Sequence, residues 1–175
     1  MKIKVIDDFF TNSEIKAIRK ELYKPKWAFA GGGEFEGDIN LFWHLDHLED
    51  NNYFSDILFK KIQIELGIKA NIKRCYANGQ TSLQSGSPHM DDGDLTVLLF
   101  TEPWKFYWGG NLVFLDNNEV FKAITYKQNR VVVFDPKIPH YAEAPNKNFN
   151  SLRISLAWKL KNIIYNYDLE KRKEK

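Results

Sequence analysis

The chain contains four histidines, and two of them stand where a metal ion could be bound. His89 and Asp91 are separated by one residue, and residues two apart on an extended chain point to the same side. His140 follows the apolar run Val131–Phe134 and the turn Asp135-Pro136. Two histidines and one carboxylate on one side of an ion leave the opposite positions open, which is the ligand pattern of non-haem Fe(II) sites.

A second histidine and carboxylate occur with the same spacing, as His44 and Asp46, and His47 follows directly. The spacing alone is a weak signal, so the surroundings must decide between the two copies. The second copy precedes the β-rich part of the chain and lacks a matching distal histidine. We therefore interpret His44 and His47 as surface or partly buried residues, with lining of a substrate mouth as the functional alternative. For His89 and Asp91 the alternative is a loop turn beside a solvated histidine.

Arginine and serine alternate with apolar residues in the run Leu152–Leu160, which predicts a strand. Its even-numbered apolar residues face one side, whereas Arg153 and Ser155 face the other. An inward-facing arginine needs an anionic partner, because an unpaired buried charge is costly. Its planar fork suits a carboxylate that is held by two hydrogen bonds. The alternatives are an exposed strand arginine or a salt bridge to a core acid.

Two helices are predicted ahead of these residues. Thr11 and Glu14 have the spacing of a capping box and open a helix that continues to about Tyr23. A second helix is predicted over Tyr53–Leu66, where apolar residues recur on one face, and Gly67 ends it.

From about Lys69 the pattern changes to short β-rich runs that are separated by turn residues. The predicted strands are Asn71–Tyr76, Leu95–Thr101, Asn111–Leu115, Val120–Tyr126, Arg130–Phe134 and Leu152–Leu160. The predicted turns are Asn78-Gly79, Asp92-Gly93, Gly109-Gly110, Asn117-Asn118 and Asp135-Pro136. This order predicts a mainly β fold with flanking helices (α+β), namely a double-stranded β-helix, or jelly roll, with the N-terminal helices packed on one sheet. We expect one domain over residues 1–162, with 1–68 as helical support, 69–162 as the jelly-roll core and 163–175 as a charged tail.

Composition limits the classes of function. The 175 residues suit a single domain, and a net charge of +2 gives no global reason to expect nucleic-acid binding. The sequence has no long apolar run of a membrane helix and no signal peptide at its start. Cys75, the one cysteine, excludes an intrachain disulfide and is expected to be a buried structural thiol. We therefore expect a cytoplasmic protein without membrane contact.

Taken together, residues 74–160 resemble the 2-oxoglutarate and Fe(II)-dependent dioxygenases, and within them the prolyl-4-hydroxylase-like branch with its small stand-alone bacterial and phage members. The resemblance rests on Tyr76-Ala77-Asn78-Gly79-Gln80, His89-Met90-Asp91, Trp108-Gly109-Gly110-Asn111-Leu112, Val132-Val133-Phe134, His140 and Arg153-Ile154-Ser155. It implies that His89, Asp91 and His140 bind Fe(II). It also implies that Arg153, with help from Ser155, binds the distal carboxylate of 2-oxoglutarate, and that Tyr76 hydrogen-bonds this co-substrate or lines its pocket.

The resemblance further implies that an unactivated C–H bond is hydroxylated with O₂ while 2-oxoglutarate is decarboxylated to succinate, with ascorbate as an optional reductant. A protein or peptide side chain is the preferred substrate. A small molecule and a nucleic acid are alternatives, the latter disfavoured by the near-neutral charge. Collagen-type prolyl hydroxylases carry lysine in place of Arg153, which argues against that type.

Two alternatives lie outside this enzyme class. One is a jelly-roll binding module that has lost catalysis, against which the presence of all three ligands and Arg153 counts. The other is a cupin-like site for a different metal, although cupins commonly use more histidines. The aromatic run Trp104–Trp108 is expected either to cover the substrate or to pack as a hydrophobic cluster.

Overall fold

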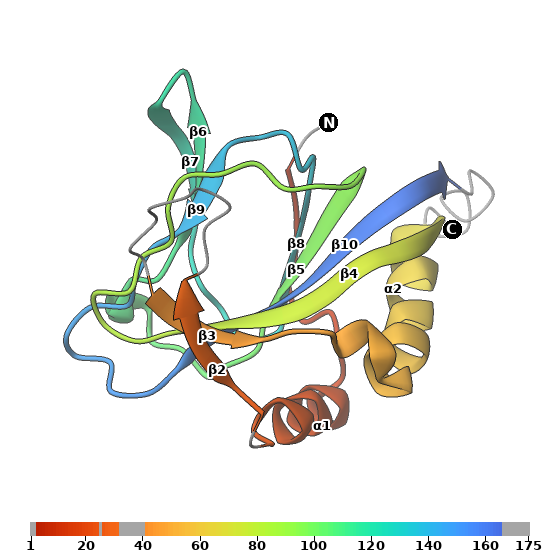
Figure 1. The fold of residues 1–175 in the computed structure, drawn as a ribbon, viewed down its shortest axis with the longest axis horizontal. Coiled ribbons are helices and arrows are strands. Elements are labelled where there is room, and N and C mark those ends of the chain that lie inside the picture. Colours follow the sequence, from red (N-terminus) through yellow and green to blue (C-terminus); the bar gives the residue numbers. More distant parts are fainter. Residues whose placement is uncertain (1–2, 25, 32–40, 166–175) are drawn as a thin grey trace.

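The computed structural model describes residues 3–24, 26–31 and 41–165 of the chain (Figure 1). Its elements are, in chain order, β1 (Lys4–Ile6), α1 (Asn12–Leu22), β2 (Ala28–Gly31), β3 (Leu41–Leu45), η1 (Leu48–Asp50), η2 (Tyr53–Ile57), α2 (Leu58–Leu66), β4 (Ile68–Gln80), β5 (Leu95–Phe100), η3 (Phe106–Trp108), β6 (Leu112–Asp116), β7 (Glu119–Ile124), β8 (Arg130–Phe134), β9 (His140–Ala142) and β10 (Arg153–Tyr165). The predicted jelly roll with flanking helices is confirmed.

The described strands form two antiparallel sheets. A seven-stranded sheet has the order β1-β8-β5-β10-β4-β3-β2, and a three-stranded sheet has the order β7-β6-β9. In Figure 1, α1 and α2 lie on the side of the large sheet that is opposite β6, β7 and β9. The long strand β10 lies near the middle of the large sheet, where it pairs with β4 on one side and β5 on the other.

The two predicted helices form with the expected boundaries. The Glu14 backbone N–H donates to Thr11 Oγ1, and the Thr11 backbone N–H donates to Glu14 Oε2, so the predicted capping box is confirmed. Residues Tyr53–Ile57 form a π-helical turn that leads into α2, and Gly67 ends α2 with φ 66°. Glycine adopts this left-handed conformation without strain. None of the helices in the described residues combines the length and hydrophobicity needed to cross a bilayer.

The strands β5 and β8 and the first part of β10 are buried on both faces, because helices cover one face and the small sheet covers the other. The helix side is an apolar cluster whose members include Ile15, Ile18, Leu22, Leu58, Ile62, Leu99, Leu156 and Trp158. A smaller apolar cluster lies between the two sheets and contains Phe100, Leu112, Phe114, Ile124, Tyr126, Val132 and Phe134. Since β10 alternates, Leu156 and Trp158 face the helices, while Arg153, Ser155 and Lys159 face the small sheet.

The N-terminal part of the chain is more than the helical support expected for residues 1–68. It also supplies β1, β2 and β3, which extend the large sheet at both edges. Each of these strands has three to five residues, which is too few for a period-two pattern to stand out in the sequence. The three-residue strand β9 went unpredicted for the same reason.

The strands β4 and β10 extend well beyond their predicted ends, whereas the other predicted strands shift by at most two residues. Asn78-Gly79 is not a turn, because both residues lie inside β4. A Cβ atom on Gly79 would lie 2.7 Å from Leu152 Cδ2, so this glycine permits close packing within the sheet. The other difference is at the end of β10, which continues to Tyr165; the remainder of the expected tail, 166–175, lies outside the described residues.

Candidate metal centre

His89, Asp91 and His140 come together in one cluster, with ligand atoms that all lie within 4.8 Å of one another. His140 Nε2 lies 3.3 Å from Asp91 Oδ2, and His89 Nε2 lies 3.5 Å from Asp91 Oδ1. The side chains of Asp91 and His140 are 3% and 5% exposed, whereas that of His89 is 40% exposed. The cluster is therefore closed on the side of the core and accessible beside His89.

Backbone pairing fixes the two histidines relative to each other. His89 and His140 form a β-bridge in which each backbone N–H donates to the other residue's carbonyl oxygen, at 3.0 and 2.9 Å. The Nδ1 atom of each ring lies 2.8 Å from the carbonyl oxygen of Ser87 or Ile138. A carbonyl oxygen can only accept, so Nδ1 carries the proton and Nε2 keeps the lone pair that a metal requires.

Asp91 is held through one of its two oxygens. Thr96 Oγ1 donates to Oδ2 at 2.8 Å, and Lys159 Nζ donates to the same oxygen. Burial acts to raise the pKa of Asp91, but the neighbouring imidazoles of His140 and His89 and the charge of Lys159 outweigh it. The pKa of this carboxyl therefore lies well below its usual range. Asp91 is ionised near neutral pH, as a metal ligand must be.

The donor set fits Fe(II). Two imidazole nitrogens and one carboxylate oxygen on one side of an ion form the facial arrangement that leaves positions open for further ligands. A structural zinc site would need a fourth protein ligand, and the cluster has only three histidine, cysteine or carboxylate members among the described residues.

The face of the large sheet that is turned toward the small sheet is its inner face. Arg153 lies on this face at the start of β10, six residues before Lys159, and is fully buried. Its Nε donates to Gly110 O and its Nη1 to Gln80 Oε1, both at 2.8 Å, and both acceptors are neutral. Its Nη2 is buried and has no hydrogen-bond partner in the described part of the chain. Burial lowers the pKa of Arg153 to about 10, so the group is still charged at neutral pH. A buried cation with a free donor fits a carboxylate ligand.

Aromatic rings and a glycine shape the surroundings of Arg153. The guanidinium carbon lies 5.0 Å from the centre of the Tyr126 ring and 5.5 Å from that of Phe100. Gly110 has φ +74°, and a Cβ atom there would lie 2.9 Å from Trp104 Cζ2 and 3.1 Å from Arg153 Nε. Glycine at position 110 is therefore required both by its backbone conformation and by the close approach of Arg153.

Tyr76 and Ser155, the other two predicted binding residues, also lie on this inner face. Ser155 is 5% exposed and neighbours Arg153 along the strand face. Tyr76 pairs with Ala157, which lies between Ser155 and Lys159 on the strand, and its ring centre lies 5.6 Å from Lys159 Nζ. Burial raises the pKa of Tyr76, which keeps its hydroxyl protonated near neutral pH. The three predicted co-substrate residues thus share one surface with the metal cluster.

The structure separates the two remaining histidines. His47 is a surface residue with an 80% exposed side chain, 3.6 Å from Glu49 Oε1. His44 pairs with Asn78 in the sheet, and Asn78 pairs with Ser155, so the three lie in one row on the inner face. His44 Nδ1 lies 3.1 Å from Asn78 Oδ1, while its Nε2 is buried without a partner among the described residues. Lining of the site, the functional alternative, fits His44 and does not fit His47.

The aromatic run 104–108 divides in a similar way. Trp104 packs against Tyr126 and Phe149 at ring-centre distances of 4.2 and 4.5 Å, so one end of the run belongs to a hydrophobic cluster. Phe106, by contrast, is 92% exposed and Tyr107 is 48% exposed. Packing as a hydrophobic cluster is therefore found at Trp104, whereas covering of the substrate by the exposed residues stays a prediction.

Three polar residues of the inner face were missed by the sequence analysis, namely Gln80, Thr96 and Lys159. Each is at most 2% exposed, and each contacts a predicted site residue. Lys159 carried a usable signal, since it follows Arg153 and Ser155 on the same strand face and is flanked by Trp158 and Leu160. Gln80 and Thr96 gave no such signal, because polar residues at strand ends are common.

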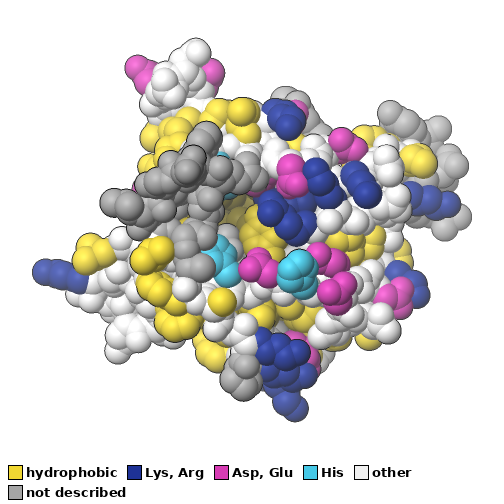
Figure 2. Space-filling view, viewed as in Figure 1, with side chains coloured by type: hydrophobic (Ala, Val, Ile, Leu, Met, Phe, Trp, Pro, Cys, Tyr) yellow, Lys and Arg dark blue, Asp and Glu magenta, His cyan; other side chains and the backbone are white. Residues whose placement is uncertain are grey.

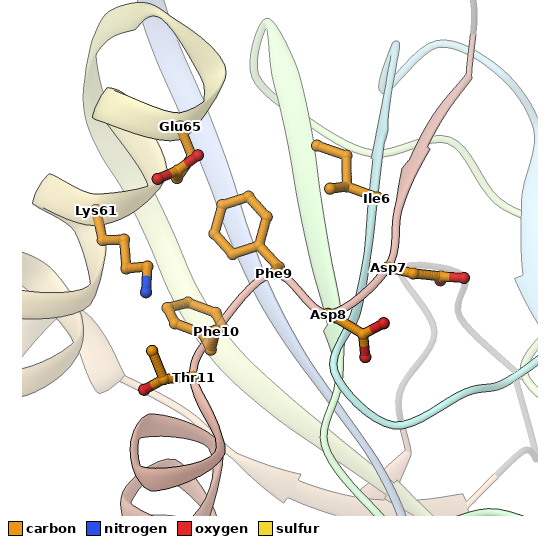
Figure 3. A pocket seen from close by; sticks show the side chains of 8 residues that line it. All are labelled: Ile6, Asp7, Asp8, Phe9, Phe10, Thr11, Lys61 and Glu65. Carbon is orange, nitrogen blue, oxygen red and sulfur yellow. The ribbon is translucent and has the colours of Figure 1, made fainter. Parts of the chain in front are cut away.

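A separate surface pocket lies between α2 and the segment that joins β1 to α1. Its lining residues are Ile6, Asp7, Asp8, Phe9, Phe10, Thr11, Lys61 and Glu65, none of which belongs to the metal cluster. Figure 3 shows Asp7 and Asp8 pointing away from Lys61 and Glu65. Asp7 binds Arg130, and Lys61 binds Glu14, so charged groups do not converge on this pocket.

The chain resembles known proteins in its structure but not in its sequence. No protein-family model and no curated protein matches the chain in sequence. A prolyl hydroxylase of Trichoplax adhaerens, solved with a peptide fragment of the hypoxia inducible factor oxygen degradation domain, has a TM-score of 0.68 at 16% identity, over 97% of this chain and 86% of that one. A prolyl-4-hydroxylase of Pseudomonas putida has a TM-score of 0.65 at 17% identity, over 90% and 92%.

A third similar structure was solved with a different set of bound molecules. HygX from Streptomyces hygroscopicus, solved with nickel, 2-oxoglutarate and hygromycin B, has a TM-score of 0.60 at 9% identity, over 90% of this chain and 82% of that one. The coverage in all three cases extends well beyond residues 74–160, on which the sequence resemblance rested. The chain therefore has the jelly-roll fold of the 2-oxoglutarate and Fe(II)-dependent oxygenases, including prolyl hydroxylases.

Proposed function

We propose that the chain is an Fe(II)- and 2-oxoglutarate-dependent dioxygenase that hydroxylates a C–H bond. The observation that carries this proposal is the presence, inside one jelly roll, of a His-Asp-His cluster and a buried arginine whose Nη2 has no partner in the described part of the chain. The cluster can hold a metal ion on one side only, and the arginine can bind a carboxylate. A 2-oxo acid with a second carboxylate suits both, because its 2-oxo acid end can bind the metal while the second carboxylate binds the arginine.

In this proposal His89, Asp91 and His140 would hold Fe(II), and Arg153 would bind the distal carboxylate of 2-oxoglutarate through Nη2. Gln80 and the Gly110 carbonyl fix the guanidinium, so its free donor is oriented before the ligand arrives. Ser155 and Tyr76 would line the space between the two binding groups. When bound, Fe(II), 2-oxoglutarate and O₂ supply the oxidising chemistry that inserts one oxygen atom into a C–H bond and yields succinate and CO₂.

The surrounding apolar residues would exclude water from the reaction. The rings of Phe134 and Phe114 lie 4.7 and 5.9 Å from that of His140, on the core side of the metal cluster. C–H oxidation needs no protein general base, and we assign none. The work of this chain is to orient the metal ligands and the co-substrate within a site that is closed to water on one side.

We further propose that the substrate is a protein or peptide side chain. The Trichoplax neighbour was solved with a peptide fragment, which makes this the first class to test. His44 adds support from this chain itself. Because the Asn78 amide oxygen can only accept, the His44 proton lies on Nδ1, and Nε2 is left as a buried acceptor. A peptide N–H is a donor of the matching kind.

Nucleic acid is the less favoured substrate. In the view of Figure 2, basic and acidic side chains lie beside one another across the middle of the face, without a continuous basic stripe. Lys73 and Arg74 both pair with Asp92, at 2.9 and 3.3 Å, so their charges are partly neutralised. A nucleic-acid groove needs uncompensated positive charge.

Succinate formation tests the proposed activity before the substrate is known. The purified chain, incubated with Fe(II), 2-oxoglutarate, O₂ and with or without ascorbate, is expected to form succinate slowly. A peptide library then serves to find a product with the mass of one added oxygen atom. His140→Ala should abolish succinate formation with the fold retained, whereas His47→Ala, at the exposed surface, should match the parent chain.

The same assay separates the enzyme from its main alternative. A chain that binds Mn(II) and 2-oxoglutarate but forms no succinate with Fe(II) and oxidises no peptide would be a jelly-roll binding module. A chain that oxidises only small molecules would keep the reaction class and lose the peptide proposal.

A further inference from the structure

Lys159 places a buried ammonium group beside the proposed metal site. The residue is 2% exposed and lies on the face of β10 that also carries Arg153 and Ser155. Its Nζ donates to Asp91 Oδ2 and lies 3.4 Å from Thr96 Oγ1. Neither its burial nor its contact with a metal ligand is explained by the roles proposed so far.

A lysine in this position is costly to the fold unless it has a function. Removing an ammonium group from water is strongly unfavourable, and the attraction to a carboxylate offsets the cost only in good geometry. Asp91 is the carboxylate that pairs with Lys159 in the described residues. An apolar side chain would fill the same place between Trp158 and Leu160 without this cost. The reason for a lysine at this position is therefore sought in its contact with Asp91.

The contacts around Asp91 are uneven between its two oxygens. Oδ2 accepts from Thr96 at 2.8 Å and from Lys159, and His140 Nε2 lies 3.3 Å away. Among the described residues, His89 Nε2 is the one polar side-chain atom found near Oδ1, at 3.5 Å. A carboxylate held in this way by two donors cannot rotate freely, and it offers Oδ1 as the available ligand atom.

We propose that Lys159 is a positioning residue that makes Asp91 a one-oxygen ligand and thereby keeps a coordination position open for 2-oxoglutarate. This inference rests on the proposed function, because it concerns the same metal. Without the ammonium group, Oδ2 is free to turn toward the metal, and a two-oxygen carboxylate occupies a position that the co-substrate needs. The positive charge of Lys159 acts in the same direction, since it helps to balance a dianionic co-substrate beside a metal already bound to one carboxylate.

Cobalt(II) absorption and 2-oxoglutarate affinity test the inference with the whole chain. Co(II) reports coordination number and geometry directly, without any turnover. In Lys159→Met, the Co(II) spectrum of the chain without co-substrate is expected to change, and Co(II) should still bind. The affinity of the Co(II)-loaded chain for 2-oxoglutarate, measured by anaerobic calorimetry, should fall about tenfold or more. Lys159→Arg, which keeps a charged donor, should recover part of the parent spectrum.

Two further variants keep the test decisive. Lys161→Met makes the same substitution at an exposed position on the same strand and should behave like the parent. Thr96→Val removes the other donor to Oδ2 and should shift the spectrum in the same direction, even if Lys159→Met does not fold. Parent-like Co(II) spectra and 2-oxoglutarate affinities in Lys159→Met, or in Thr96→Val if that is the folded variant, would overturn the inference. If the parent itself fails to bind 2-oxoglutarate, the proposed function fails, while the Co(II) spectra still report on the role of Lys159.

Discussion

The two faces of the seven-stranded sheet are both buried in its central strands, yet their chemistry is opposite. The face under α1 and α2 is apolar, and Leu156 and Trp158 belong to it. The face toward the small sheet carries Arg153, Ser155 and Lys159, all at most 5% exposed. Alternate residues of one strand thus serve two purposes. One face supplies the hydrophobic stabilisation, while the other holds buried charges, of which Arg153 keeps an Nη2 donor without a partner in the described residues.

Of the substitutions on the two faces, Trp158→Ala is expected to have the largest effect, which is a loss of stability. Trp158 is fully buried on the helix side, and its Nε1 donates to Phe54 O at 3.2 Å. Truncation leaves a cavity and an unpaired carbonyl, so the free energy of unfolding should fall by about 3–5 kcal/mol. Denaturant unfolding of the metal-free chain measures it. Trp158→Phe, which fills most of the space, should lose clearly less; an equal loss would mean that packing is not the cause.

Arg153→Ala probes the opposite face. Charge-assisted hydrogen bonds are worth about 1.5–3 kcal/mol each, so 2-oxoglutarate affinity should fall by about one to three orders of magnitude. Anaerobic calorimetry with Mn(II) in the site measures the affinity. Metal binding itself should persist, because His89, Asp91 and His140 are unchanged.

Arg153→Lys sharpens the same measurement. It keeps a charge but loses the planar fork, and it should therefore bind 2-oxoglutarate with intermediate affinity. Parent-like affinity in Arg153→Ala would make Arg153 a structural residue and remove the main support for the co-substrate.

Gly110→Ala tests how closely the backbone must approach the binding face. The new Cβ atom meets Trp104 Cζ2 at 2.9 Å and Arg153 Nε at 3.1 Å, so Arg153 must shift. We expect a loss of 2-oxoglutarate affinity of about tenfold, in line with one weakened charge-assisted hydrogen bond. Gly109→Ala is the matched control, because it has a similar φ of +69° but meets no atom closer than 3.9 Å. Equal losses in the two variants would assign the effect to backbone strain alone.

The smallest effect on stability is expected from the exposed ion pair between Asp7 and Arg130, in contrast to the buried charges of the inner face. A hydrogen bond from Arg130 lowers the pKa of Asp7 from 3.8 to about 2. Because the folded-state pKa is depressed, the stabilisation is present above pH 3.8 and is lost as the pH falls through about 2. Since the Asp7 side chain is 38% exposed, the loss should not exceed about 1 kcal/mol.

Acid unfolding followed between these two pH values measures the contribution of Asp7. In Asp7→Asn this part of the pH dependence should be absent, whereas Asp8→Asn, at a 78% exposed side chain, should retain it. Identical acid-unfolding curves for the parent and Asp7→Asn would show that the pair contributes nothing.

The features that could be predicted from sequence are those set by near neighbours in the chain. The Thr11–Glu14 capping box, the left-handed Gly67 and the turn at Asn117-Asn118, where both residues have positive φ, depend on a few adjacent residues. The two faces of β10 also followed from sequence, because side-chain direction alternates along any strand.

Only the tertiary structure decided which distant residues meet. His89 and His140 share a β-bridge, and Lys159 reaches Asp91 across 68 residues of sequence. The placement of His44 beside Asn78 likewise depends on how β3 pairs with β4. Strand pairing and register are set by the hydrophobic packing of the whole domain, and a shift of one residue would turn each of these side chains to the opposite face. Residue types and local spacing therefore indicated the metal ligands and Arg153, whereas the role inferred for Lys159 became visible only when the sheet was assembled.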